Sequence, residues 1–221
     1  QGQPGALADR MIKTKGSVKL LLVHQNFPGQ FRQLVPHLLK RGHQLRAICS
    51  HQRPLMADVE VARYEEPANQ NHLPDAPGLS FWNEASHRAP LVWQNCFQWH
   101  TKFWKPDLIL GHSGWRETLL LKQLWPQVPQ LNWPELWVRP EHAGYGIDTG
   151  SKPTLKQLTE FELRNQLTRA ALSHAEAWVL PTRHQATSFP NEFQDSRMHV
   201  IHEGIDSSIA TPNAQAAYVV R

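Results

Sequence analysis

The sequence predicts a doubly wound α/β fold, with a mostly parallel sheet of about seven strands and helices on both faces. Residues 17–42 give the first evidence, because an apolar run from Val18 to Val23, interrupted only by Lys19, leads into a polar turn and a helical pattern. This order is typical of a buried parallel strand followed by a turn and a helix. Strand-like and helical segments then alternate along the chain, as in βαβ units. A chain of 221 residues, 40% of them hydrophobic, can bury one sizeable core.

The predicted strands are short apolar segments bounded by turn residues. In chain order they lie at residues 18–23, 43–50, 59–65, 108–110, 128–133, 177–180 and 198–202. The carboxyl ends of parallel strands meet at one edge of the sheet, where doubly wound folds bind their ligands. The candidate site segments at that edge are residues 24–30, 112–117, 133–146, 181–184 and 202–206.

Helices are predicted between these strands. They lie at residues 29–42, 79–104, 116–125, 155–174 and 182–190. Pro36 removes a backbone donor, so the first helix is expected to kink or to start late, and Pro90 is expected to kink the second. Pro153 is placed in the first turn of the helix over 155–174. Thr182 and Gln185 match a capping box at the start of the last helix.

The chain divides into three parts. Residues 1–16 are polar and contain glycine and proline, so we expect them to be disordered and to lie outside the fold. Residues 17–204 form the α/β domain, and residues 205–221 are expected to be a linker. Within the domain, residues 134–152 form a long loop rich in proline and glycine, and loops of this length are usually functional.

Composition narrows the class of protein. The net charge of +4 permits an anionic substrate or a membrane surface, but lysine and arginine are scattered, which weighs against nucleic-acid binding. No apolar run approaches the roughly 20 residues needed to cross a bilayer. Cys49 and Cys96 lie among apolar neighbours and at no metal-binding spacing, so we expect reduced core thiols and a cytoplasmic protein.

The first turn contains a single glycine. It therefore matches neither a dinucleotide-binding fingerprint nor a P-loop. Gly29 allows a ligand to approach the backbone, and amides at the start of the following helix are suited to a phosphate. A plain tight turn explains the same residues equally well.

The strand ends also bear on two other classes of site, a serine hydrolase site and a metal site. The sequence Gly111-His112-Ser113-Gly114-Trp115 is similar to a hydrolase nucleophile elbow, although Trp115 replaces the last small residue. A serine hydrolase that uses Ser113 is therefore one alternative. No metal site is expected, because His199 and His202 fall on opposite faces of a predicted strand.

The segment from His24 to Arg32, followed by Arg41-Gly42-His43, resembles the opening of family-4 glycosyltransferases. Further similarities follow in the same order along the chain. They are Pro106-Asp107, His112-Ser113-Gly114-Trp115 with Glu117, Pro181-Thr182-Arg183, Phe189-Pro190, and Ile201-His202-Glu203-Gly204-Ile205-Asp206.

This resemblance implies one Rossmann-like half of a GT-B fold, in which two such domains face each other across a cleft. The chain would be the N-terminal, acceptor-binding domain, and residues 205–221 would lead to a C-terminal domain that binds the nucleotide sugar. It implies a retaining, metal-independent transferase that needs no cofactor and moves a sugar from a nucleotide-sugar donor to a glycan, lipid-linked or small-molecule acceptor. The implied setting is polysaccharide biosynthesis in the cytoplasm, with a peripheral contact at the inner face of the cell membrane. Residues 1–221 alone would be inactive.

The resemblance also implies roles for individual residues. His112 would be the catalytic residue beside the reacting sugar, and Gly29 and Gln30 would contact the donor phosphates or the transferred sugar. The acceptor would be lined by His24, Asn26, Trp115 and Glu117. Helix packing for Trp115 and a first-turn helix charge for Glu117 are equally good explanations. A stand-alone α/β module that binds a carbohydrate or a nucleotide is the remaining alternative.

Overall fold

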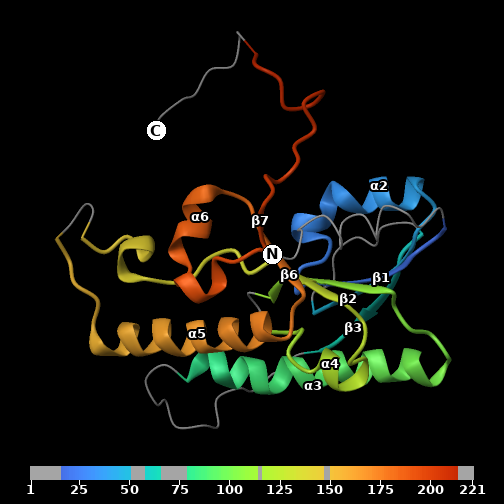
Figure 1. The fold of residues 1–221 in the computed structure, drawn as a ribbon, viewed down its shortest axis with the longest axis horizontal. Helices are drawn as coiled ribbons and strands as arrows, with labels where there is room; N and C mark the ends of the chain where they lie inside the picture. The colour runs from blue at the N-terminus through green and yellow to red at the C-terminus, as the bar shows by residue number, and fades with distance from the viewer. Residues whose placement is uncertain (1–15, 51–57, 66–78, 114–115, 147–149, 214–221) are drawn as a thin grey trace.

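The computed structural model describes residues 16–50, 58–65, 79–113, 116–146 and 150–213. Within them lies one sheet of seven strands, in the order β3-β2-β1-β4-β5-β6-β7, and every pair of neighbours is parallel (Figure 1). The strands are β1 (Lys19–Val23), β2 (Gln44–Cys49), β3 (Glu60–Arg63), β4 (Leu108–Gly111), β5 (Gln130–Asn132), β6 (Ala177–Leu180) and β7 (Met198–Val200). The predicted parallel α/β sheet is confirmed.

Helices cover both faces of this sheet. They are η1 (Gly29–Arg32), α2 (Leu34–Lys40), α3 (Ser80–Thr101), α4 (Leu121–Leu124), η3 (Pro140–Ala143), α5 (Leu155–Ser173), α6 (Arg183–Ser188) and η4 (Asn191–Phe193). Figure 1 shows α2 and α6 on one face and α3, α4 and α5 on the other. The fold is therefore doubly wound. No helix in the described part of the chain is long and apolar enough to cross a membrane.

The packing explains the apolar run from Leu20 to Val23 of β1. Leu20 and Leu22 belong to the core cluster on the α2 face, whereas Leu21 and Val23 belong to the cluster under α3 and α4. Successive side chains of a strand point to opposite faces, so a strand buried on both faces needs apolar residues at every position. Cys49 lies in the first cluster and Cys96 in the second, and they form no disulfide.

The helix predicted over residues 116–125 is wrong for most of its length. Only Leu121–Leu124 is helical, and residues 117–120 form turns. Arg116 itself has a φ of 71°, in the left-handed region, so it cannot be the first residue of a right-handed helix.

Two prolines act at helix starts in different ways. Pro36 lies in the first turn of α2, which begins at Leu34 after the short η1, so the predicted late start is confirmed. The prediction that Pro153 lies inside the first turn of α5 is wrong, because Thr154 is the N-cap and forms a reciprocal capping box with Gln157.

The remaining predictions concern the ends of the chain and its loops. Residues 204–213 are exposed and contain no regular helix or strand. The predicted disordered start, Trp115 and the last part of the linker lie outside the described residues. The division into a domain over 17–204 and a linker over 205–221 stays a prediction.

The strand order places a crevice between β1 and β4. The chain runs outward from β1 to β2 and β3, then crosses back to β4 on the other side of β1. Open α/β sheets bind ligands at such a reversal, beyond the carboxyl ends of the strands. Val23 pairs with Gly111 there, so the residues that follow them, His24 and His112, are brought side by side.

Candidate active site

Two buried histidines stand at the reversal point of the sheet. Their ring centroids are 4.6 Å apart, and the side chains of His24 and His112 are only 3% and 1% exposed. The backbone N–H of His112 donates to the carbonyl of Val23, 2.8 Å away, which ties the two strand ends together. His24, predicted to line the acceptor, and His112, predicted to be catalytic, therefore lie side by side.

A continuous chain of polar contacts links these histidines to Gln30 and Glu135. His24 Nδ1 accepts the backbone N–H of Asn26 at 2.9 Å, so the ring proton is carried by Nε2, which donates to Gln30 Oε1. Gln30 Nε2 donates to Glu135 Oε1 at 2.7 Å, and His112 Nε2 lies 3.0 Å from the same oxygen. We call these four residues the histidine–glutamate chain. It fixes the tautomer of His24 and the orientation of both rings.

Gly29 is required by the ring of His24. Its φ of 45° is in the left-handed region, and an added Cβ would lie 2.3 Å from His24 Nε2. Any side chain would displace the imidazole from Gln30. The ring of His24 therefore occupies the space that a side chain at position 29 would need.

Glu135 is the site residue that sequence reasoning missed. It follows β5 in the predicted segment 133–146 but was not singled out there. Its φ of 65° is unusual for a residue with a side chain. The hydrogen bond from His112 lowers the pKa of Glu135, against the opposing effect of burial. The residue is a carboxylate at neutral pH. The one available signal in the sequence is its position directly after Trp133-Pro134, at the end of a predicted strand.

A pocket of about 380 Å³ opens beside this chain on the α2 and α6 face of the sheet. Gln30 forms one side, Leu34 and Trp133 form apolar walls, and His202 and Glu203 close the far side. The indole Nε1 of Trp133 is buried and has no hydrogen-bond partner among the described residues. An aromatic wall beside polar groups is suited to a sugar or another partly apolar ligand.

Glu117 lies beneath the site. It is 1% exposed, and its Oε1 accepts a hydrogen bond from the Tyr64 hydroxyl at 2.8 Å. Burial raises the pKa of Glu117 to about 8, although the hydrogen bonds and the charges of Arg88 and Arg116 oppose the rise. Glu117 is not in the first turn of a helix, so the alternative explanation as a first-turn charge is wrong.

The raised pKa of Glu117 predicts a pH dependence of stability. Between its unfolded pKa of 4.5 and about 8, the folded state binds more protons than the unfolded state, so the free energy of unfolding falls as pH rises. Glu117→Gln keeps an acceptor for Tyr64 and removes the titration. From pH 6 to pH 8 the wild type should lose about 2 kcal/mol more than this variant in urea unfolding. Parallel pH profiles would refute the assignment, and Glu65→Gln, at an exposed position, is the control.

The other predicted site residues differ in position. Asn26 is half-buried beside His24, and its Oδ1 has no hydrogen-bond partner among the described residues. Trp115 lies outside the described residues. Ser113 is buried, and in the described part of the chain its hydroxyl has no hydrogen-bond partner, whereas the nucleophile of a serine hydrolase is hydrogen-bonded to a base.

A family comparison identifies the class of protein. The model of the glycosyl transferase family 4 group matches residues 41–210, which is most of the chain. The chain belongs to the glycosyl transferase family 4 group. The matched range contains His112, Glu117 and Glu135, whereas His24, Gly29 and Gln30 precede it. A search of curated proteins finds no match.

Solved structures show the same fold for this family 4 chain. A double variant of Os79 from O. sativa, solved in complex with UDP, has a TM-score of 0.60 and 13% identity, over 91% of this chain and 56% of that one. A UDP-glucosyltransferase from Polygonum tinctorium has a TM-score of 0.57 and 8% identity, over 91% and 55%. A UDP-glucose:anthocyanidin 3-O-glucosyltransferase has a TM-score of 0.53 and 12% identity, over 90% and 56%. The Rossmann-like fold thus matches GT-B glycosyltransferases, and the family 4 chain spans about half their length.

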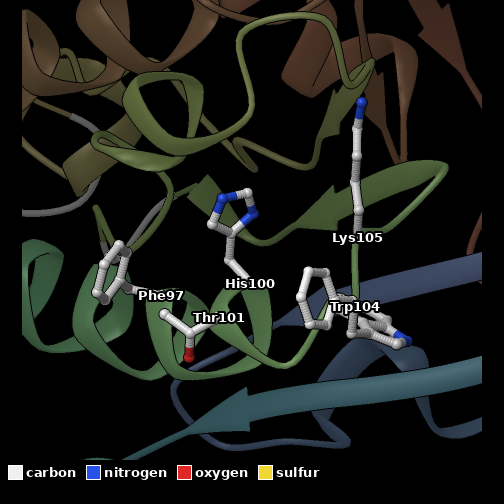
Figure 2. Close-up of a pocket in the computed structure, with 6 residues that line it drawn as sticks. Phe97, His100, Thr101, Trp104 and Lys105 are labelled. Carbon is white, nitrogen blue, oxygen red and sulfur yellow. The ribbon is translucent and has the colours of Figure 1, made fainter.

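A second pocket, of about 650 Å³, lies at the opposite edge of the sheet of this family 4 domain. Figure 2 shows Phe97, His100 and Thr101 on the last turns of α3, and Trp104 and Lys105 on the segment that leads to β4. This segment enters the amino end of β4, whereas the histidine–glutamate chain lies beyond its carboxyl end. The two pockets are therefore separate.

Proposed function

We propose that this chain is the acceptor-binding half of a retaining glycosyltransferase that uses a nucleotide sugar. The observation that carries the proposal is the histidine–glutamate chain at the β1–β4 reversal, next to a pocket with an aromatic wall. The chain covers about half the length of the glycosyltransferases that it matches, and in this proposal a second domain binds the nucleotide.

In this proposal His112 is the catalytic residue and hydrogen-bonds a hydroxyl of the transferred sugar. Glu135 orients the imidazole, and Gln30 connects it to His24. Gly29 and Gln30, at the start of η1, face the donor phosphates when the second domain closes. Rate enhancement then comes from positioning and from stabilising the departing diphosphate.

The proposal includes transfer without a bound metal ion. Two carboxylates near the site already have partners on the protein, Glu135 with His112 and Gln30, and Glu117 with Tyr64. Transfer should therefore proceed in the presence of EDTA.

The acceptor is proposed to be a glycan, a lipid-linked sugar or a small molecule, handled on the cytoplasmic side of the membrane in polysaccharide biosynthesis. His24, Asn26, Trp115 and Glu117 are its proposed lining. Trp133, which the sequence did not reveal, lines the pocket beside Gln30 and offers an aromatic wall to the transferred sugar.

A panel of nucleotide sugars, beginning with UDP-sugars, tests this function. Residues 1–221 alone should transfer sugar poorly or not at all, and the protein that joins them to a donor-binding domain should transfer at an ordinary enzyme rate. Tight sugar or nucleotide binding by residues 1–221, without transfer by the longer protein, would instead favour a stand-alone binding module.

We also propose that the end of α3 makes the peripheral membrane contact. Phe103 is 98% exposed, and it stands between the exposed Lys102 and Lys105 beside the pocket of Figure 2. Its φ of 60° is in the left-handed region, where helix ends usually place glycine. An exposed aromatic at a strained position, flanked by lysines, suits the interface of an anionic membrane.

The variant Phe103→Gly separates membrane contact from folding. Glycine relieves the strained backbone, so stability should be kept or raised, while partitioning onto phosphatidylglycerol-containing vesicles should fall roughly tenfold. Leu155→Ser removes another exposed apolar side chain, on α5, and should leave partitioning unchanged. Equal partitioning by Phe103→Gly and the wild type in a vesicle sedimentation assay would reject the proposed contact.

A further inference from the structure

Three arginines gather on the α3 and α5 face of the sheet, beside the turn that follows β4. Arg88 comes from α3, Arg164 from α5 and Arg116 from the turn itself. Glu84 of α3 serves two of them, since its Oε2 lies 3.2 Å from Arg88 Nη1 and 3.7 Å from Arg116 Nη1. We call the three arginines together with Glu84 the arginine cluster.

The guanidinium of Arg116 is buried. Its side chain is 2% exposed, and none of its three guanidinium nitrogens has a hydrogen-bond partner among the described residues. The guanidinium lies over the ring of Phe81, 4.2 Å from its centroid, and that of Arg164 lies 5.4 Å from the same centroid. The ring attracts both cations but offers no acceptor oxygen. A buried charge without hydrogen bonds is costly, so these donors are suited to a ligand.

Arg116 is a cation that no carboxylate among the described residues hydrogen-bonds. Burial and the nearby charge of Arg164 lower the pKa of Arg116 to about 10, so it is still charged at neutral pH. Glu117, with a pKa of about 8, is largely protonated there. Glu84 reaches Arg116 only at 3.7 Å, and the charge of Glu135 acts on Arg164.

We propose that Arg116 and Arg164 bind a phosphate group of the sugar acceptor, next to His112. This inference rests on the proposed glycosyl transfer and names the acceptor class. The planar donor fork of a guanidinium matches two oxygens of a phosphate. Glu84 and Arg164 are half-buried and form the open side of the cluster.

The position of the cluster separates it from the donor phosphates. Gln30, their proposed contact, begins the η1 and α2 segment on one face of the sheet. Arg116 and Arg164 meet Phe81 of α3 on the other face. Glu135 connects the two faces. It accepts a hydrogen bond from Gln30, and its negative charge interacts with the guanidinium of Arg164. The acceptor phosphate and the donor diphosphate would thus approach His112 from opposite sides.

Titration calorimetry of residues 1–221 with inorganic phosphate tests the site directly. The dissociation constant should rise at least roughly tenfold in Arg164→Gln and in Arg116→Gln, as expected for the loss of charged hydrogen bonds. Arg169→Gln is the matched control, because Arg169 is on the same helix and pairs with Glu192 outside the cluster. Absence of phosphate binding by the wild type, or equal binding by folded Arg164→Gln, overturns the site. Arg164 is half-buried, so this variant carries the test if Arg116→Gln fails to fold.

Inhibition of the transfer reaction by inorganic phosphate tests the acceptor assignment. Phosphate should compete with the acceptor and leave the KM of the nucleotide sugar unchanged, and Arg164→Gln should weaken this inhibition. Competition with the nucleotide sugar would overturn the assignment to the acceptor. Cluster-dependent phosphate binding with no transfer by the longer protein would reject the glycosyl-transfer function and, with it, the acceptor assignment, while the anion site itself would stand.

Discussion

Replacing His112 with alanine should reduce kcat for sugar transfer by about 10²- to 10³-fold in the protein that contains both domains. The reason is that a preorganised hydrogen-bonding group beside the reacting sugar contributes roughly 3–4 kcal/mol to stabilising the transition state. His112 is held by Glu135 and is almost completely buried, so water replaces it poorly. Steady-state kinetics with a saturating nucleotide sugar would measure the effect.

A control variant separates this loss from a general disturbance of the fold. His87→Ala changes a histidine of α3 that belongs neither to the site nor to the arginine cluster, and its kcat should stay near that of the wild type. Thermal unfolding of both variants should show similar stability. A wild-type rate in His112→Ala would remove this residue from the catalytic machinery.

Replacing Gly111 with alanine should cost about 2–3 kcal/mol of folding free energy, as severe overpacking does. Gly111 ends β4 at the centre of the sheet, and an added Cβ would lie 2.2 Å from Thr118 Cγ2. Both residues are held by strand pairing and by the turn after β4, so neither can move freely. Urea unfolding at constant pH would measure the loss.

The partner of this clash provides the control. Thr118→Ser removes only Cγ2, so the double variant Gly111→Ala/Thr118→Ser should recover most of the stability that the alanine removes. The coupling between the two substitutions should then be large, as for residues in direct contact. Additive losses in the double variant would show that the clash with Thr118 is not the cause.

The sheet could be predicted from the sequence because its signals are local. The run from Leu20 to Val23 is apolar at each position, since β1 is covered on both faces, and the same reasoning found β4 and β6. The predicted turns at 24–30 and 112–117 follow, because parallel strands bring their carboxyl ends to one edge. Local pattern and sheet geometry thus gave the positions of His24 and His112.

The remaining site residues depend on backbone conformations that sequence patterns do not reveal. Glu135 and Arg116 both adopt positive φ, although neither is glycine. Glu135 contacts His112 from this conformation, and Arg116 cannot be the first residue of the predicted helix in it. The contact of Gln30 with Glu135 joins residues 105 positions apart, so it could not be inferred from spacing.

A double-mutant cycle on the rate of sugar transfer tests the central claim most directly, namely that the histidine–glutamate chain acts as one unit in glycosyl transfer. The cycle compares the wild type, His112→Ala, Glu135→Gln and the double variant, with kcat measured on the two-domain protein. If Glu135 acts through His112, Glu135→Gln should slow transfer, and adding it to His112→Ala should cause little further loss. Independent, multiplying losses, or full activity in either single variant, would contradict the account.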